Sequence, residues 1–136
     1  MTKSALSLTL AAAAAAIVVP ATLAAHHGWG WTQDEESRIS GQIVSISFGN
    51  PHMQVQLRRE LGGFGGSEIW NVDLSPPIVA ERSGFGPDHA AAGDEAIITG
   101  HRARDMDVRA FKGETITVRG QTFNVYPQRE ITLQPE

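Results

Sequence analysis

The sequence predicts a mainly β fold, a small barrel with one short helix, and three observations support this prediction. Segments in which apolar and polar residues alternate recur along the chain. Turns rich in glycine, proline and asparagine separate these segments. A short helical pattern follows the third of them. Three strands, one helix and then further strands is the order of a five-stranded OB-type barrel, and a two-sheet β-sandwich is the alternative.

The first three strands are expected to form a meander. The first runs from residue 37 to the Phe48-Gly49-Asn50-Pro51 turn, with apolar residues that alternate loosely with serine. Residues 53–58 have the clearest alternation, because Met53, Val55 and Leu57 share one face. A glycine-rich connection at 61–67, in which Phe64 is expected to be exposed, leads to a third strand over 68–74.

The helix is expected over residues 75–84. Ser75 has the side chain of an N-cap, because its hydroxyl can accept a hydrogen bond from the first turn. Pro76 and Pro77 fall where a missing N–H is tolerated, and Gly84 can end the helix.

The remaining strands and the domain limits follow from the second half of the chain. A fourth strand is expected over 95–100, and residues 108–118 and 122–126 suggest a bent strand and a terminal hairpin. Pro127 ends the regular pattern. We therefore expect a single domain over residues 25–127 and a loosely ordered tail over 128–136.

The first 24 residues have the pattern of a secretory signal peptide. Lys3 supplies a short positive region, residues 6–19 are apolar or small, and Ala24 and Ala25 are the small residues that a signal peptidase reads. The apolar run is shorter than the roughly 20 residues of a membrane-spanning helix. We expect cleavage after Ala24 or Ala25, a periplasmic or secreted protein, and no integral membrane segment.

Composition excludes several classes of function. The chain has no cysteine, so disulfides, thiolate catalysis and cysteine-based metal clusters are excluded. Its formal charge is −4 and it has no basic stripe, which argues against a nucleic-acid partner. It also lacks the motifs of nucleophilic hydrolases and phosphate-binding loops, so we do not expect an enzyme.

Cleavage would create a new α-amine next to His26 and His27. If Ala25 stays, the amine, two backbone amides and the His27 imidazole can fill the square plane that copper(II) favours. If Ala25 is removed, the amine and imidazole of His26 can chelate copper together with one further histidine from the fold. The alternative is a pair of solvated histidines beside a terminus.

Two histidines of the domain are candidate partners for this pair. Pro51 fixes the backbone before His52 and presents it at the start of a strand. His101 directly follows the expected fourth strand and is an additional candidate ligand; a surface-loop histidine is the alternative. No pattern assigns a role to His89. The predicted metal ligands are therefore His26, His27, His52 and His101, and the predicted ion is copper.

Five sequence elements follow one another in the expected mature chain: Ala25-His26-His27-Gly28-Trp29, Asn50-Pro51-His52, Trp70, Gly93-Asp94 and residues 99–105. In this order and spacing they resemble a family of small exported bacterial proteins of unknown function. The resemblance implies a periplasmic or secreted β-rich domain without established enzymatic activity, in which His26, His27 and His52 act together. The chain differs from the commoner pattern at Gly28-Trp29, where Ser-Phe is usual, and at position 101, which more often holds another residue type.

Three functional hypotheses follow. The first is an exported β-barrel that binds a transition metal, copper above all, for carriage, sensing or buffering. The second is a metal-free interaction module for a peptide, a glycan or an envelope protein. The third is a copper redox enzyme with an N-terminal histidine brace. The sequence identifies no particular protein partner.

Overall fold

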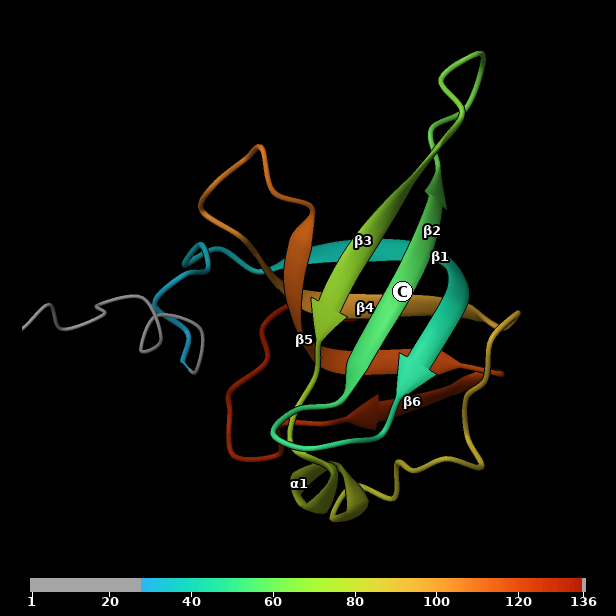
Figure 1. The fold of residues 1–136 in the computed structure, drawn as a ribbon. Helices are drawn as coiled ribbons and strands as arrows, with labels where there is room; N and C mark the ends of the chain where they lie inside the picture. Colours follow the sequence, from blue (N-terminus) through green and yellow to red (C-terminus); the bar gives the residue numbers. More distant parts are fainter. Residues whose placement is uncertain (1–27, 136) are drawn as a thin grey trace, which may run out of the picture.

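The computed structural model describes residues 28–135, which form six strands and one short helix (Figure 1). The predicted signal peptide and the His26-His27 pair lie outside the described residues. The elements in chain order are β1 (Ser37–Ser47), β2 (Gln54–Glu60), β3 (Ser67–Asp73), α1 (Pro77–Glu81), β4 (Glu95–Arg102), β5 (Ala110–Val118) and β6 (Gln121–Asn124).

Strand β1 holds the barrel together because it pairs with a different strand on each side (Figure 1). Its first half is antiparallel to β4 and its second half is antiparallel to β2. The order β3-β2-β1-β4-β5 then closes on itself, because β3 and β5 pair in parallel, and β6 extends from β5. With α1 between β3 and β4, this is the predicted OB-type barrel, and the β-sandwich alternative is excluded.

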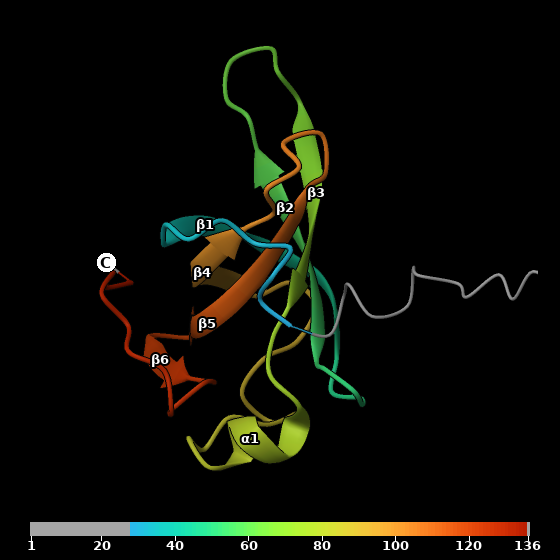
Figure 2. The same cartoon turned by 90° about the vertical axis from the view of Figure 1, so that its left-hand side faces the viewer.

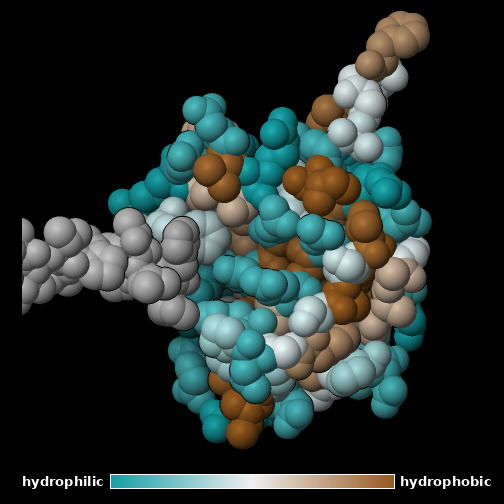
Figure 3. All heavy atoms as spheres, in the orientation of Figure 1, coloured by the Kyte–Doolittle hydropathy of each residue, from teal (hydrophilic) through white to brown (hydrophobic). Residues whose placement is uncertain are grey.

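The connection between β2 and β3 projects from the barrel (Figures 1 and 2). Leu61 and Gly66 are joined by a backbone hydrogen bond of 2.9 Å, and the loop beyond it extends away from the rest of the chain. Phe64 is fully exposed at this loop, as the sequence predicts. The space-filling view shows an apolar tip that projects beyond the rest of the molecular surface (Figure 3).

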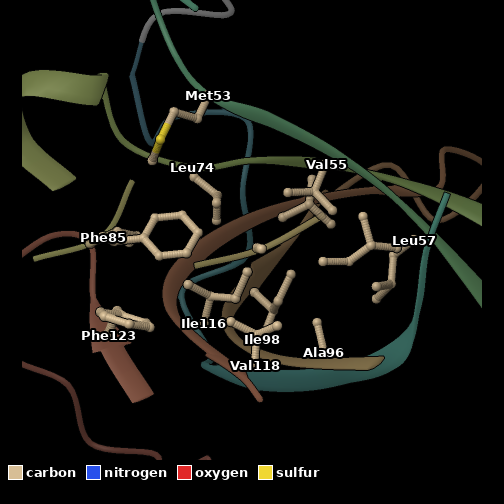
Figure 4. Close-up of a cluster of buried hydrophobic side chains, with 14 of the residues drawn as sticks. Met53, Val55, Leu57, Leu74, Phe85, Ala96, Ile98, Ile116, Val118 and Phe123 are labelled. Atoms are coloured by element: carbon tan, nitrogen blue, oxygen red, sulfur yellow. The ribbon is translucent and has the colours of Figure 1, made fainter. Parts of the chain in front are cut away.

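The hydrophobic core fills the barrel and the space between the barrel and the segment after α1 (Figure 4). The predicted face of Met53, Val55 and Leu57 is confirmed, because all three side chains are buried. Residues two apart along a strand point to the same face, so β2 contributes these three together. Phe85 and Phe123 pack against each other with ring centroids 5.1 Å apart and close the core at one end.

The helix is shorter than predicted, and its N-cap is not the expected one. Ser75 does not cap it: its backbone carbonyl accepts a hydrogen bond from Met53 and its hydroxyl is buried inside the fold. Pro76 takes the N-cap position in an extended conformation, and Pro77 begins the helix as expected. Among the described residues, no helix has the length and apolar content needed to cross a membrane.

An irregularity in the β4–β5 pairing positions a buried charge. Thr99 pairs with Thr115 but Gly100 pairs with Gly113, so β5 carries one extra residue, Glu114. A β-bulge of this kind re-aims the side chain of the extra residue. Gly100 is required for the close approach, because a Cβ at this position would lie 2.0 Å from the carbonyl oxygen of Lys112.

Candidate functional site

Buried polar residues gather on β4 and β5, on the face opposite the core. Thr99 and Thr115 lie opposite each other on this face, and a hydrogen bond of 2.6 Å joins their hydroxyls. The segment before β1 and the tail after β6 run beside it (Figure 2). The buried polar side chains on the two strands are Thr99, His101, Lys112, Glu114 and Thr115.

His101 lies inside β4, and not in a loop after it as the sequence predicted. The strand extends through Arg102 because the register shift at Gly100 lets pairing with β5 continue. The surface-loop alternative is wrong, since only 7% of the His101 side chain is exposed. Its Nδ1 lies 2.9 Å from the backbone oxygen of Gln33. A carbonyl oxygen only accepts hydrogen bonds, so Nδ1 carries the hydrogen.

The other ring nitrogen of His101 points to Glu114. Nε2 lies 3.4 Å from Oε1 of Glu114, whose side chain is completely buried. Oε1 also accepts a hydrogen bond of 2.5 Å from Nε of Arg129. Within residues 28–135, neither Nε2 of His101 nor Oε2 of Glu114 has a hydrogen-bond partner. Such buried, unpartnered atoms are rare in proteins and indicate strain, an ordered water or a bound ion.

Glu36, just before β1, completes the cluster. One ligand atom each from Glu36, His101 and Glu114 lie within 4.8 Å of one another. The Glu36 carboxylate accepts hydrogen bonds from the backbone N–H groups of Thr132 and Leu133, at 2.6 to 3.1 Å. Burial alone would raise the pKa of Glu36, but these N–H groups bring it below its usual value.

Trp29 covers the cluster and connects it to the N-terminal segment. Its ring meets His101 edge to face, with centroids 5.6 Å apart, and Arg129 lies 3.7 Å from the ring centroid. Lys112 donates a hydrogen bond of 3.3 Å to the carbonyl oxygen of Gly28, and burial lowers the pKa of this lysine. Of the two residues that follow the His26-His27 pair in sequence, Trp29 therefore contacts the cluster and Gly28 contacts Lys112, which pairs with His101 across the two strands.

The donor set suits a metal ion. Zinc and copper sites in proteins use imidazole nitrogens together with carboxylate oxygens. A metal-bound histidine usually donates its second N–H to a carbonyl or a carboxylate, as Nδ1 of His101 does to Gln33. A neutral imidazole would also present its Nε2 lone pair to the Glu114 carboxylate. Two acceptors so close require a cation between them or a proton on Nε2.

His52, the other predicted ligand among the described residues, is not part of this cluster. His52 lies in the connection before β2, two residues ahead of Gln54. Gln54 pairs with Asp73, Asp73 with Lys112 and Lys112 with His101, which makes three strand spacings, roughly 14 Å along the sheet. His89 packs instead against aromatic rings of the core. His26 and His27 lie outside the described residues.

Sequence reasoning missed Glu36 and Glu114. Glu36 looked like one of three consecutive surface acids, Asp34-Glu35-Glu36. Glu114 had a usable signal, because a carboxylate between two apolar stretches of a predicted strand is rarely buried without a partner or a role.

Comparison with known proteins identifies a family. The model of a family of unknown function, DUF6152, matches residues 12–112. No curated protein matches the sequence. The single-stranded DNA binding protein Rim1 from mitochondria of S. cerevisiae is similar in structure, with 11% identity and a TM-score of 0.45 over 62% of this chain and 92% of that chain. The Stn1-Ten1 complex of S. pombe gives 11% identity and a TM-score of 0.43 over 63% of this chain and 59% of that chain.

Proposed function

We propose that this chain, which belongs to the DUF6152 family of unknown function, is an exported protein that binds a transition-metal ion. The observation that carries the proposal is the pair of buried, unpartnered atoms, Nε2 of His101 and Oε2 of Glu114. A buried polar atom without a partner costs about 1–3 kcal/mol. A metal ion bound to both atoms would offset this cost, and Glu36 supplies a third donor from the same cluster.

The expected N-terminus adds nitrogen donors. Cleavage after Ala24 or Ala25 would leave an α-amine beside His26 and His27, and nitrogen-rich donor sets favour copper(II). The contacts of Gly28 and Trp29 with Lys112 and His101 support a site at this end of the chain.

His52 is the alternative partner of the terminal histidines. It is not part of the cluster of Glu36, His101 and Glu114, so His52 and His101 define separate proposals for where the N-terminus binds. Single variants of His52 and His101 distinguish them. In either case we propose that the protein carries, senses or buffers the ion. The alternative, a copper redox enzyme, is tested by measuring copper-dependent turnover.

A second candidate function is a metal-free interaction module. The observation in its favour is the projecting β2–β3 connection, where Phe64 is fully exposed and Leu61 is half exposed (Figure 3). Single exposed apolar residues are common, but an aromatic ring on a projecting loop offers a contact for a peptide, a glycan or an envelope protein.

The experiment begins with expression of the chain with its own first 24 residues. Mass spectrometry of the product from each cell fraction identifies the N-terminus and the compartment. Copper(II) and zinc(II) are then titrated calorimetrically into the chelator-treated protein. We expect His101→Ala to weaken binding at least about tenfold, while His89→Ala, which alters a histidine packed on the core, leaves it unchanged.

Two results would count against metal binding. One is wild-type protein that binds neither ion more tightly than a variant lacking His26, His27, His52 and His101. The other is equal weakening by His89→Ala and His101→Ala. Copper-dependent turnover with a peroxide or a reductant would instead favour the redox enzyme.

A further inference from the structure

The carboxylates of the proposed metal site already have partners in the C-terminal tail, which the structure describes over residues 128–135. Nε of Arg129 donates to Oε1 of Glu114 at 2.5 Å. The N–H groups of Thr132 and Leu133 donate to the carboxylate of Glu36. The tail therefore supplies one positive charge and two hydrogen-bond donors to the cluster.

Arg129 supplies a positive charge to the Glu114 carboxylate, next to where the proposed metal ion would bind. Its guanidinium lies over the ring of Trp29 and binds Glu114, so it stands next to the two groups that contact His101. Charge-assisted hydrogen bonds of this type are among the strongest in proteins. The side chain is still 37% exposed, which gives it a route into solvent.

A second contact attaches the tail to the first strand. Nη2 of Arg38 donates to the backbone oxygen of Gln134 at 2.5 Å. This contact and the Glu36 contacts involve exposed or half-exposed groups, whose ion pairs and hydrogen bonds contribute little to stability. The tail has no helix or strand of its own, and these polar contacts attach it to the barrel.

We propose that the C-terminal tail is a gate that competes with the metal ion for Glu36 and Glu114. This inference rests on the proposed metal-binding function. A divalent ion on Glu114 and the guanidinium of Arg129 on the same carboxylate repel each other, so binding of the ion favours release of Arg129 from Glu114. Coordination by Glu36 likewise takes lone pairs that now accept the N–H groups of Thr132 and Leu133.

Competition of this kind is reciprocal. If docking of the tail lowers the affinity for the ion, then the ion lowers the docking of the tail by the same factor. The gate can therefore be measured from the metal side, by affinity, and from the tail side, by exposure of its backbone.

The test from the metal side uses the mature chain with His26→Ala and His27→Ala, so that only the barrel ligands are counted. Zinc(II) is titrated into this protein with and without Arg129→Gln. We expect Arg129→Gln to raise the affinity between about five- and 150-fold, the usual range of coupling between sites. Arg119→Gln is the matched control, because Arg119 is a similarly exposed arginine bound to a different carboxylate, Asp94.

The test from the tail side needs no substitution in the site. Hydrogen exchange at the amides of Thr132 and Leu133 is measured in the same protein with and without zinc(II). We expect faster exchange when zinc is bound, because Glu36 no longer accepts these N–H groups. This measurement also decides the question if Arg129→Gln fails to fold.

The two proposals fail in different ways. Zinc binding that is unchanged or weakened by Arg129→Gln, with unchanged exchange at Thr132 and Leu133, overturns the gate and leaves the metal site standing. No zinc or copper binding by either form, nor by the protein that keeps His26 and His27, overturns both. If the protein with Arg129→Gln binds zinc and the protein with Arg129 does not, the result supports a gate that stays closed while Arg129 is present.

Discussion

Nε2 of His101 lies 3.4 Å from Oε1 of Glu114, and the two buried side chains come from the neighbouring strands β4 and β5. Since Nδ1 of His101 donates to Gln33, Nε2 has no hydrogen to offer in the neutral ring. The pair therefore needs a positive charge. Arg129 contributes one from the tail, and a metal ion or a proton on Nε2 would contribute another.

Replacement of Glu114 by glutamine tests the acidic half of this pair. Glu114→Gln keeps the volume of the side chain and removes the charge, so we expect metal affinity to fall at least about tenfold while the fold is retained. Glu68→Gln is the matched control, because Glu68 is also bound to arginine but lies on β3, away from the cluster. Calorimetric titration with zinc(II) measures both, and equal losses would contradict the assignment of Glu114.

Gly100→Ala tests the register shift that brings His101 to Glu114. The new Cβ would lie 2.0 Å from the carbonyl oxygen of Lys112, so the two strands must separate. We expect a loss of about 2–3 kcal/mol in the free energy of unfolding, measured by urea denaturation. Gly30→Ala is the control, since nothing lies within 4 Å of a Cβ there. A loss at Gly100 no larger than at Gly30 would show that the bulge is not required.

Tyr126 is the single tyrosine of the chain, so its titration can be observed directly. Burial, and next the negative charge of Asp73, raise the pKa of Tyr126 to about 12. Its contribution to stability is therefore complete below about pH 10, the unfolded value, and is lost as the pH rises toward 12.

The absorbance of the phenolate measures this pKa. Trp29 packs against Tyr126 with ring centroids 5.1 Å apart. We expect Trp29→Ala to admit water and to lower the pKa of Tyr126 toward 10. The same pKa in both proteins would mean that Trp29 does not shield this end of the barrel.

Glu68 predicts an acid-dependent part of the stability. Hydrogen bonds from Arg109, at 2.6 Å, and from Trp70, at 2.7 Å, lower the pKa of this carboxyl. A lowered folded-state pKa gives stability above the unfolded value, about 4.3, that is lost as the pH falls through the folded value. We expect the unfolding free energy of wild type to drop more steeply than that of Glu68→Gln below about pH 4. Urea denaturation at several pH values measures this. The same fall in unfolding free energy for the two proteins across this range would contradict the prediction.

Phe64 is expected to be dispensable for folding. Because its side chain is fully exposed, Phe64→Ser should change the unfolding free energy by less than about 0.5 kcal/mol. Phe123→Ala, in the core, should cost about 3–5 kcal/mol in the same urea denaturation experiment. A large loss at Phe64 would mean that the loop packs on the barrel, which would remove the support for an interaction surface there.

Much of the fold could be predicted from local patterns. Met53, Val55 and Leu57 alternate with polar residues, and this period of two specifies one buried face whatever the rest of the chain does. The short helix was also predicted, but its N-cap was wrong. Ser75 has the right chemistry for a cap, yet its backbone bonds to Met53, and no local pattern contains that contact.

The sequence by itself determined the order of the strands along the chain, the face that β2 buries and the position of the helix, because these depend on neighbours along the chain. Only the tertiary structure decided that His101 lies within a strand and meets Glu114, because one extra residue in β5 shifts the register beside Gly100. It likewise brought Glu36 to Thr132, 96 residues away in the sequence. Contacts at that separation depend on how the barrel closes and on where the segment before β1 and the tail after β6 lie on the β4–β5 face. The alternation of residues along the chain determines neither.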